Sequence, residues 1–345
     1  MEEQNCDYRQ IYKIETPQKT SKRGIRGFKI WLVVLLCIAA FGLIIGLAVK
    51  SLLSDSVAAA PAEPYVGVLY VEGVIARGNV DSWGRAVDYQ HDFTLDAIDD
   101  LIGDSNNKAL ILWVDSPGGG VYESDELYFK IKEYRQSTGR PVFSYMASMA
   151  ASGGYYIAAP SDAIFANRNC WTGSIGVTIG TLYDISGFLE KHGVDTVTIT
   201  SGKNKSMGSM VDPLTDEQRK IFQSLVDEAY EQFIGIVAEE RQMDISAVRK
   251  LADGRIYTAS QAEELGLLDT VASYEELLSY MADEFGLEGA LIHDIIYYDN
   301  SFMGRLLGRL PLPNGPASEA EAVLSLIHNE VNFPVSYLCE VLKAR

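Results

Sequence analysis

The sequence predicts an α/β fold preceded by one N-terminal transmembrane helix. Three observations support this prediction. Residues 30–49 contain no charged side chain. From residue 65 onward, apolar strand-like runs alternate with amphipathic segments, which is the pattern of an α/β domain. With 345 residues and 47% hydrophobic content, the chain is long enough to bury the core of one large domain or two small ones.

The uncharged run begins at Ile30 and ends at Val49, and as a helix it would cross a hydrocarbon core of about 30 Å. It has no polar face, which argues against a buried core helix. Basic residues are concentrated in residues 1–29, and only Lys50 follows closely, so the positive-inside rule places the N-terminus in the cytoplasm. A cleaved signal peptide is the alternative, because small residues follow at 57–60. The apolar part of a signal peptide is usually about 7–15 residues long, which favours an uncleaved anchor.

These observations predict a domain order. We expect a cytoplasmic basic tail at residues 1–29, a transmembrane helix at 30–49, a tether rich in Ala, Ser and Pro at 50–64, and an extracytoplasmic domain at 65–345 with a C-terminal helical and strand extension. The tail has seven Lys/Arg and four Asp/Glu. Since the whole chain carries −18, the remainder carries −21. A domain this acidic is repelled by phosphate backbones, which argues against nucleic-acid binding.

Within the domain, hydrophobic periodicity predicts the order of the elements. Strands are expected at residues 66–75, 109–114, 142–145, 163–166, 175–179 and 194–200, and helices at 95–102, 124–134, from Ser152, and at 215–241. Thr215 followed by Gln218 fits a capping box for the long helix. Helix and strand alternate again over 255–269, 274–285 and 291–298. Beyond them, residues 303–312 are apolar with arginines, and the helix-like stretch 317–331 could serve in subunit contacts or close the core.

Cysteine and histidine usage limits the possible chemistry. Cys170 and Cys339 are the only cysteines of the expected ectodomain, so they allow at most one disulfide, and the sequence leaves that pairing open. The four histidines have no metal-ligand spacing such as HExxH, which gives a zinc hydrolase little support.

Residues 115–120 read DSPGGG and lie between an expected strand and an expected helix. Glycines allow positive φ and expose consecutive N–H groups, so this segment could form an anion-binding nest suited to an oxyanion. An ordinary strand-to-helix turn is the alternative. A phosphate loop is excluded because GxxxxGK[ST] is absent.

Residues 149–156 read MAASGGYY and place Ser152 at the start of a helix, where N-terminal N–H groups stabilise negative charge. Ser152 could instead be a helix N-cap. The GxSxG elbow of the α/β-hydrolases is not matched, because residue 150 is alanine.

Residues 201–208 read SGKNKSMG and contain Lys203 and Lys205. A lysine has an ordinary pKa of about 10.4, so it acts as a base near neutral pH only if burial destabilises its ammonium form. The alternative is an exposed polar loop.

Together these segments resemble the signal peptide peptidase A (protease IV) family. The matches are SPGGGVYES at 116–124, ASGGYYIA at 151–158, TGSIGV at 172–177 and DGRIYTASQAEELGLLD at 253–269, so the resemblance covers about residues 65–269. It implies a crotonase-like β/α superhelical core, shared with the Clp protease and usually assembled into rings.

The resemblance also implies residue roles. It places the nucleophile on Ser152 and the general base on Lys205. Ser174 matches the serine that hydrogen-bonds the lysine amine, and the oxyanion donors fall on the backbone N–H groups of Gly119 and Gly153.

The implied protein is a membrane-anchored serine endopeptidase that hydrolyses remnant signal peptides and other peptides through an acyl-enzyme, with no metal or organic cofactor. One departure is Asn204, where the family usually has tyrosine or histidine before the base, and it leaves Lys203 as the alternative base. An acyl-CoA enzyme of the crotonase type is a competing function, against which the extracytoplasmic orientation argues. A catalytically inactive scaffold for membrane-protein association is another, and the presence of serine and lysine together argues against it.

Assembly is the remaining expectation. Some family members carry two tandem cores, with the serine from one and the lysine from the other. This chain has one core, so the dyad forms either within one chain or between the subunits of a homo-oligomeric ring.

Overall fold

The computed structural model describes residues 41, 60–78, 88–297 and 336–338. The chain divides into two compact units, residues 1–54 and 55–345. Of the first unit only Phe41 is described, as a helical residue. The predicted transmembrane helix, tail and tether therefore lie almost wholly outside the described residues, as do the stretches 303–312 and 317–331. Within the described part of the chain, no helix is both long enough and apolar enough to cross a membrane.

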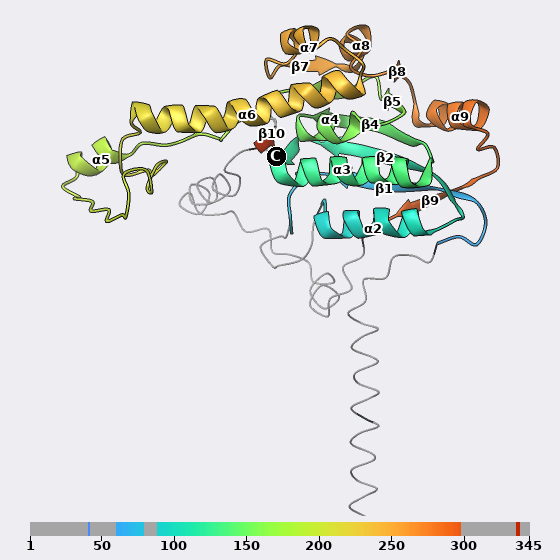
Figure 1. Ribbon diagram of the computed structural model, residues 1–345, viewed down its shortest axis with the longest axis horizontal. Helices are drawn as coiled ribbons and strands as arrows, with labels where there is room; N and C mark the ends of the chain where they lie inside the picture. Colours follow the sequence, from blue (N-terminus) through green and yellow to red (C-terminus); the bar gives the residue numbers. More distant parts are fainter. Residues whose placement is uncertain (1–40, 42–59, 79–87, 298–335, 339–345) are drawn as a thin grey trace, which may run out of the picture. The chain divides into compact units, whose positions relative to one another are not determined.

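The second unit is built on a largely parallel sheet with helices packed against it (Figure 1). Its strands are β1 (Tyr65–Glu72), β2 (Asn107–Ser116), β3 (Gly118–Gly120), β4 (Val142–Ala151), β5 (Ala163–Ala166), β6 (Trp171–Gly173), β7 (Ile256–Thr258), β8 (Thr270–Val271), β9 (Leu291–Ile295) and β10 (Ser336–Leu338). Its helices are α2 (His91–Gly103), α3 (Val121–Thr138), α4 (Gly153–Ala158), α5 (Ser186–Lys191), α6 (Asp216–Glu240), α7 (Ile245–Leu251), α8 (Ala259–Glu264) and α9 (Tyr274–Phe285).

The main sheet has the strand order β7-β6-β4-β2-β1-β9, and β4 forks within it. The first half of β4 pairs with β5 and the last three residues pair with β6. All of these pairings are parallel except that between β6 and β7. The sheet also joins strands that are far apart in the sequence, because β1 pairs with β9. β10 lies outside the main sheet and pairs antiparallel with β3.

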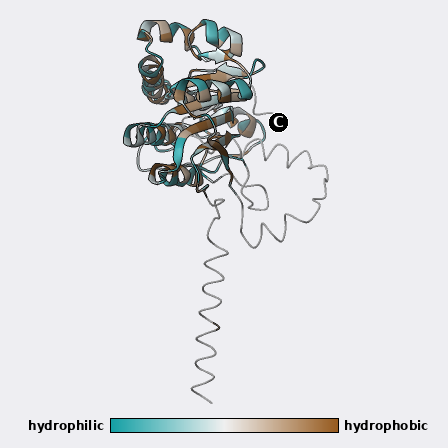
Figure 2. Cartoon of the chain, turned by 90° about the vertical axis from the view of Figure 1, so that its right-hand side faces the viewer, coloured by the Kyte–Doolittle hydropathy of each residue, from teal (hydrophilic) through white to brown (hydrophobic). Residues whose placement is uncertain are grey.

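Alternation along the strands divides the core between two faces. On β1, Leu69 and Val71 belong to the buried cluster that packs under helices such as α3 and α6, whereas Val66 and Val68 belong to the cluster under α9. Figure 2 shows hydrophobic residues concentrated in the strands between the helices. A sheet covered on both faces by helices is the arrangement that the strand and helix pattern predicts.

The long helix α6 confirms a prediction made from local sequence. Thr215 accepts a hydrogen bond from the Gln218 backbone N–H, and the Gln218 side chain bonds back to Thr215, which completes the capping box. The helix then runs to Glu240, close to the predicted end. The predicted segments 163–166 and 274–285 are likewise confirmed as β5 and α9.

Two predicted strands are wrong. Residues 175–179 contain only an isolated bridge residue, Thr178, and residues 194–200 are irregular. Val197 is 84% exposed and Ile199 is 93% exposed, and no described strand pairs with this segment. A lone extended segment leaves its backbone groups without ladder partners, so its β-branched residues alone do not make it a strand. The segment belongs to an arm, residues 179–226, in which α5 and the first half of α6 extend away from the sheet (Figure 1).

Candidate active site

Ser152 lies at the sharp turn between β4 and α4. Its φ of 54° and ψ of −116° fall in a region that residues other than glycine rarely adopt. Two backbone hydrogen bonds hold this conformation, from the Ser152 N–H to the Gly173 carbonyl (2.8 Å) and from the Tyr156 N–H to the Ser152 carbonyl (2.9 Å). The residue is 1% exposed and occupies the N-cap position of α4, as the alternative reading of the sequence expected, but its side chain makes no capping hydrogen bond. Strain of this kind concentrates at functional sites.

The glycine strand β3 passes close to the chain segment after β1. The Ile75 N–H donates to the Gly118 carbonyl, and the Gly120 N–H donates to the Ile75 carbonyl, each at 2.9 Å. A Cβ atom on Gly119 would lie 1.9 Å from the Ile75 carbonyl oxygen, so only glycine fits there. Gly118 has a φ of 98°, and its N–H donates to Ser116 Oγ at 3.1 Å. The glycines of this motif therefore serve close backbone approach as well as turning.

Gly153 brings the start of α4 against β3. A Cβ atom on Gly153 would lie 3.1 Å from the Gly119 nitrogen. The Gly119 nitrogen, one predicted oxyanion donor, therefore lies next to Gly153, which carries the other and directly follows Ser152. As the first residue of α4, Gly153 has no carbonyl one turn earlier in the helix to accept its N–H.

Ser174 follows β6, the neighbour of β4 at the fork. Its N–H donates to the Arg255 carbonyl at 2.7 Å, and its φ of 49° is also positive. The preceding residue, Gly173, accepts the hydrogen bond from the Ser152 N–H. This backbone hydrogen bond places Ser174 one residue from the partner of Ser152.

Lys205 is not brought to this cluster. It lies in the arm, its side chain is exposed, and no hydrogen bond or ion pair joins its amine to another described residue. Lys203 differs, because its amine forms an ion pair with Glu217 at 2.7 Å. The hydrogen bond from the Lys203 amine lowers the pKa of the Glu217 carboxyl, and a longer hydrogen bond from the Asn204 side chain adds to this effect. In the described part of a single chain, residues 201–208, the lysine loop, therefore form an exposed polar loop. This is the alternative that the sequence leaves open for the segment.

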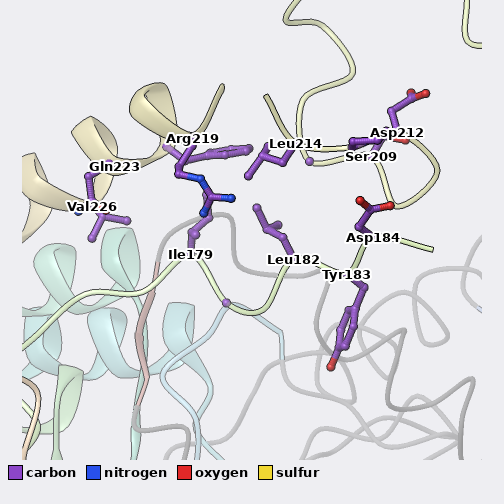
Figure 3. A pocket seen from close by; sticks show the side chains of 14 residues that line it. Ile179, Leu182, Tyr183, Asp184, Ser209, Asp212, Leu214, Arg219, Gln223 and Val226 are labelled. Carbon is purple, nitrogen blue, oxygen red and sulfur yellow. The ribbon is translucent and has the colours of Figure 1, made fainter. Parts of the chain in front are cut away.

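A cleft in the arm borders the lysine loop (Figure 3). It has a volume of about 450 Å³ and is lined by residues of the loop after β6, of the segment that follows Lys205, and of α6. In Figure 3 the Arg219 side chain extends from α6 toward Ile179 and Leu182. Gly208, the last residue of the 201–208 segment, and the adjacent Ser209 also line the cleft.

Ser124, near the start of α3, is a buried polar residue that the sequence did not single out. Its Oγ is the one buried side-chain polar atom without a hydrogen-bond partner among the described residues. A Cβ atom on Gly153 would lie 2.6 Å from it, so the hydroxyl packs directly against the start of α4. The available signal was its place at the end of the SPGGGVYES match.

Burial also shifts the pKa of other groups in this domain. Burial, followed by the nearby carboxylates of Asp115 and Asp88, raises the pKa of Glu72 at the end of β1. Cys170 is a free, buried cysteine, and burial raises the pKa of its thiol to about 12, which argues against a nucleophilic role. Its candidate partner Cys339 lies outside the described residues. The described chain also contains no cluster of three His, Cys, Asp or Glu side chains that could hold a metal ion.

Comparison with known proteins identifies relatives of this chain. The model of peptidase family S49 matches residues 134–288. A protein of Enterococcus faecium assigned as a signal peptide peptidase SppA is 40% identical over 236 residues, which cover 68% of this chain and 67% of that protein. A protein of Methanocaldococcus jannaschii assigned as a protease is 33% identical, covering 63% of this chain and 73% of that protein.

Two further matches are a longer protease and a solved structure. Protease 4 of Haemophilus influenzae is 36% identical, but the aligned part covers only 34% of that protein. The solved structure of a mutant of the 1510-N membrane-bound stomatin-specific protease covers 69% of this chain and 100% of that one, at 18% identity and a TM-score of 0.42. That likeness is too weak to support an argument.

Substituting Ser152 tests the backbone strain at the turn. Glycine adopts positive φ without steric cost, whereas alanine keeps the strain, which costs on the order of 1–3 kcal/mol. We expect the free energy of unfolding of Ser152→Gly to exceed that of Ser152→Ala by about 1 kcal/mol in urea denaturation. Ser137 in α3 is the matched control, where alanine should be the more stable replacement by about 1 kcal/mol. The same ranking at both positions would contradict the strain.

Proposed function

This chain belongs to peptidase family S49 and is a serine peptidase, and we propose that it is a membrane-anchored endopeptidase that hydrolyses remnant signal peptides and other peptides outside the cytoplasm. The observation that carries the proposal is the meeting of the strained Ser152 turn with the neighbouring nitrogens of Gly119 and Gly153. A nucleophile beside two backbone donors is the arrangement that acyl transfer requires. The largely parallel sheet is compatible with the crotonase-like core that the family resemblance implies.

The proposed chemistry follows from these positions. The Ser152 hydroxyl attacks the peptide carbonyl carbon, and the neutral Lys205 amine takes its proton and passes it to the leaving amine. The Gly119 and Gly153 N–H groups stabilise the oxyanion, and Ser174 orients the lysine amine. Water then attacks the resulting ester, with Lys205 again as base, and releases the acid. Neither step needs a metal or an organic cofactor.

Lys205 is a better candidate for the base than Lys203. The Lys203 amine is held in an ion pair with Glu217 at 2.7 Å, so it would have to leave this partner before it could act at Ser152. The Lys205 amine has no such partner among the described residues, so an apolar surface brought against it could remove it from water.

The arm of a second copy could supply that apolar surface. We propose a homo-oligomeric ring in which Lys205 of one subunit lies at Ser152 of its neighbour. Large apolar side chains of the arm are exposed in the single chain: Leu182, Tyr183, Phe188, Val194, Val197 and Ile199. Apolar side chains gathered in this way are typical of surfaces that another protein covers. A second copy would bury them and desolvate the lysine loop together.

Variants of the serine and the two lysines test the proposed dyad. Ser152→Ala should abolish hydrolysis of a fluorogenic peptide by the full-length protein in detergent and should also abolish labelling by a fluorophosphonate. Lys205→Ala should lower kcat by about 10²–10⁴-fold, the usual contribution of a general base. Lys203→Ala is the matched control and should have a mild effect. A larger loss in Lys203→Ala than in Lys205→Ala would refute the assignment of the base.

Mixing two inactive variants tests the assembly. If each site joins one subunit's serine to another subunit's lysine, Ser152→Ala and Lys205→Ala subunits exchanged in equal amounts should recover about a quarter of the native activity, because one in four neighbouring pairs then holds both groups. The recovered rate is measured after exchange has been verified by mass. Full activity in a verified monomer, or no recovery despite exchange, would show that the dyad forms within one chain.

Protease protection tests the proposed membrane topology. Because basic residues are concentrated before residue 30, a protease added outside spheroplasts should release the domain that begins near Tyr65 and leave residues 1–29 protected. Immunoblots against tags at either end report the outcome, with lysed spheroplasts as the control. Protection of the large domain in intact spheroplasts would invert the topology.

A further inference from the structure

Ser124 lies in the first turn of α3, the helix that packs beside α4 (Figure 1). The residue is fully buried, and among the described residues its Oγ is the one buried side-chain polar atom without a hydrogen-bond partner. A buried hydroxyl of this kind has lost its hydrogen bonds to water and gained none in the protein, which lowers the stability of the fold. A role in binding or catalysis accounts for a group that folding alone disfavours.

A serine on a helix can hydrogen-bond the carbonyl four residues earlier. Ser137, on the same helix, does so, because its Oγ donates to the Glu133 carbonyl at 2.7 Å. The Ser124 hydroxyl makes no such bond to the Gly120 carbonyl. It lies instead against Gly153, the first residue of α4.

Three groups that can donate a hydrogen bond surround the space that a side chain on Gly153 would fill. A Cβ atom there would lie 2.6 Å from Ser124 Oγ and 3.1 Å from the Gly119 nitrogen. The third group is the nitrogen of Gly153 itself, which is bonded to the same Cα atom. Glycine at this position leaves room for the hydroxyl, so the unpaired oxygen of Ser124 lies beside both proposed oxyanion donors.

We propose that the Ser124 hydroxyl is a third hydrogen-bond donor to the oxyanion, in addition to the N–H groups of Gly119 and Gly153. The proposal rests on the proposed function, in which those N–H groups hold the substrate oxygen. The hydroxyl donates its hydrogen bond and keeps its proton. An oxyanion accepts a stronger hydrogen bond than a neutral carbonyl, so this donor stabilises the transition state more than the bound substrate. Because the hydroxyl has no partner at rest, no existing hydrogen bond has to break.

Ser124→Ala tests the proposal in the full-length protein, because it removes the hydroxyl and keeps the Cβ atom. The kcat for a fluorogenic peptide should fall about 10²-fold, the usual loss for one oxyanion donor, while KM stays unchanged. A peptide aldehyde forms an adduct with Ser152 that resembles the tetrahedral intermediate, so its affinity should also fall about 10²-fold. The matching peptide alcohol cannot form the adduct and should bind the native protein and the variant equally.

Urea unfolding separates this role from a packing role. Ser124→Ala removes an unpaired buried hydroxyl, so its urea midpoint should equal or exceed that of the native protein. Ser144 is the matched control, a buried serine whose Oγ is hydrogen-bonded to Ser161 Oγ at 2.7 Å. Ser144→Ala leaves the Ser161 hydroxyl without that partner, so its urea midpoint should fall while kcat and the affinity for the aldehyde stay unchanged.

The inference and the proposed function fail in different ways. If the native protein hydrolyses the peptide and Ser124→Ala has the same kcat, the inference is overturned and the proposed function stands. A lower urea midpoint in Ser124→Ala, with equal losses of affinity for the aldehyde and the alcohol, shows a packing role and also overturns the inference. If the native protein hydrolyses no peptide and a fluorophosphonate leaves Ser152 unlabelled, the proposed function fails and the third donor fails with it.

Discussion

The close approach of Gly119 to the Ile75 carbonyl is the constraint on which the rest of the site depends. A Cβ atom would meet that oxygen at 1.9 Å, so the chain can pass there only as bare backbone. The approach fixes β3 between residue 75 and the start of α4, where Gly153 also lacks a side chain for want of space. Two backbone nitrogens from distant parts of the sequence are thereby held together, without any side chain that could move out of place.

The fork in β4 provides the second part of this geometry. Its first half is held between β2 and β5, and its last residues are held by β6, so the strand is fixed on both sides up to the turn at Ser152. The rigid sheet can hold a positive φ at Ser152 because the Gly173 carbonyl anchors its N–H. The proposed nucleophile is thus positioned by the sheet, whereas the proposed base belongs to an arm outside it.

Local signals in the sequence predicted much of the fold. The capping box at Thr215 and Gln218 marked the start of α6, and periodicity located β5 and α9, because such features depend on neighbouring residues. The sequence motifs also singled out Ser152, Ser174, Gly119 and Gly153, which lie close together in the structure. What the sequence did not predict depends on partners distant along the chain. Residues 194–200 have strand-forming side chains but no neighbouring strand, and the pairing of β10 with β3 had no local signal.

The pairing of β1 with β9 has a consequence for the order of folding. β1 is the first strand of the domain to be synthesised, and one of its two neighbours begins at Leu291, after most of the domain. Until that segment arrives, one edge of β1 presents unpaired backbone groups, which other extended chains can join. Parallel pairing over such a distance also closes slowly. A nascent chain of this protein therefore passes through a stage in which most of the sheet has formed and one edge of β1 can still pair with other chains. The yield of folded protein then depends on the rate of synthesis and on protection of that edge from neighbouring chains.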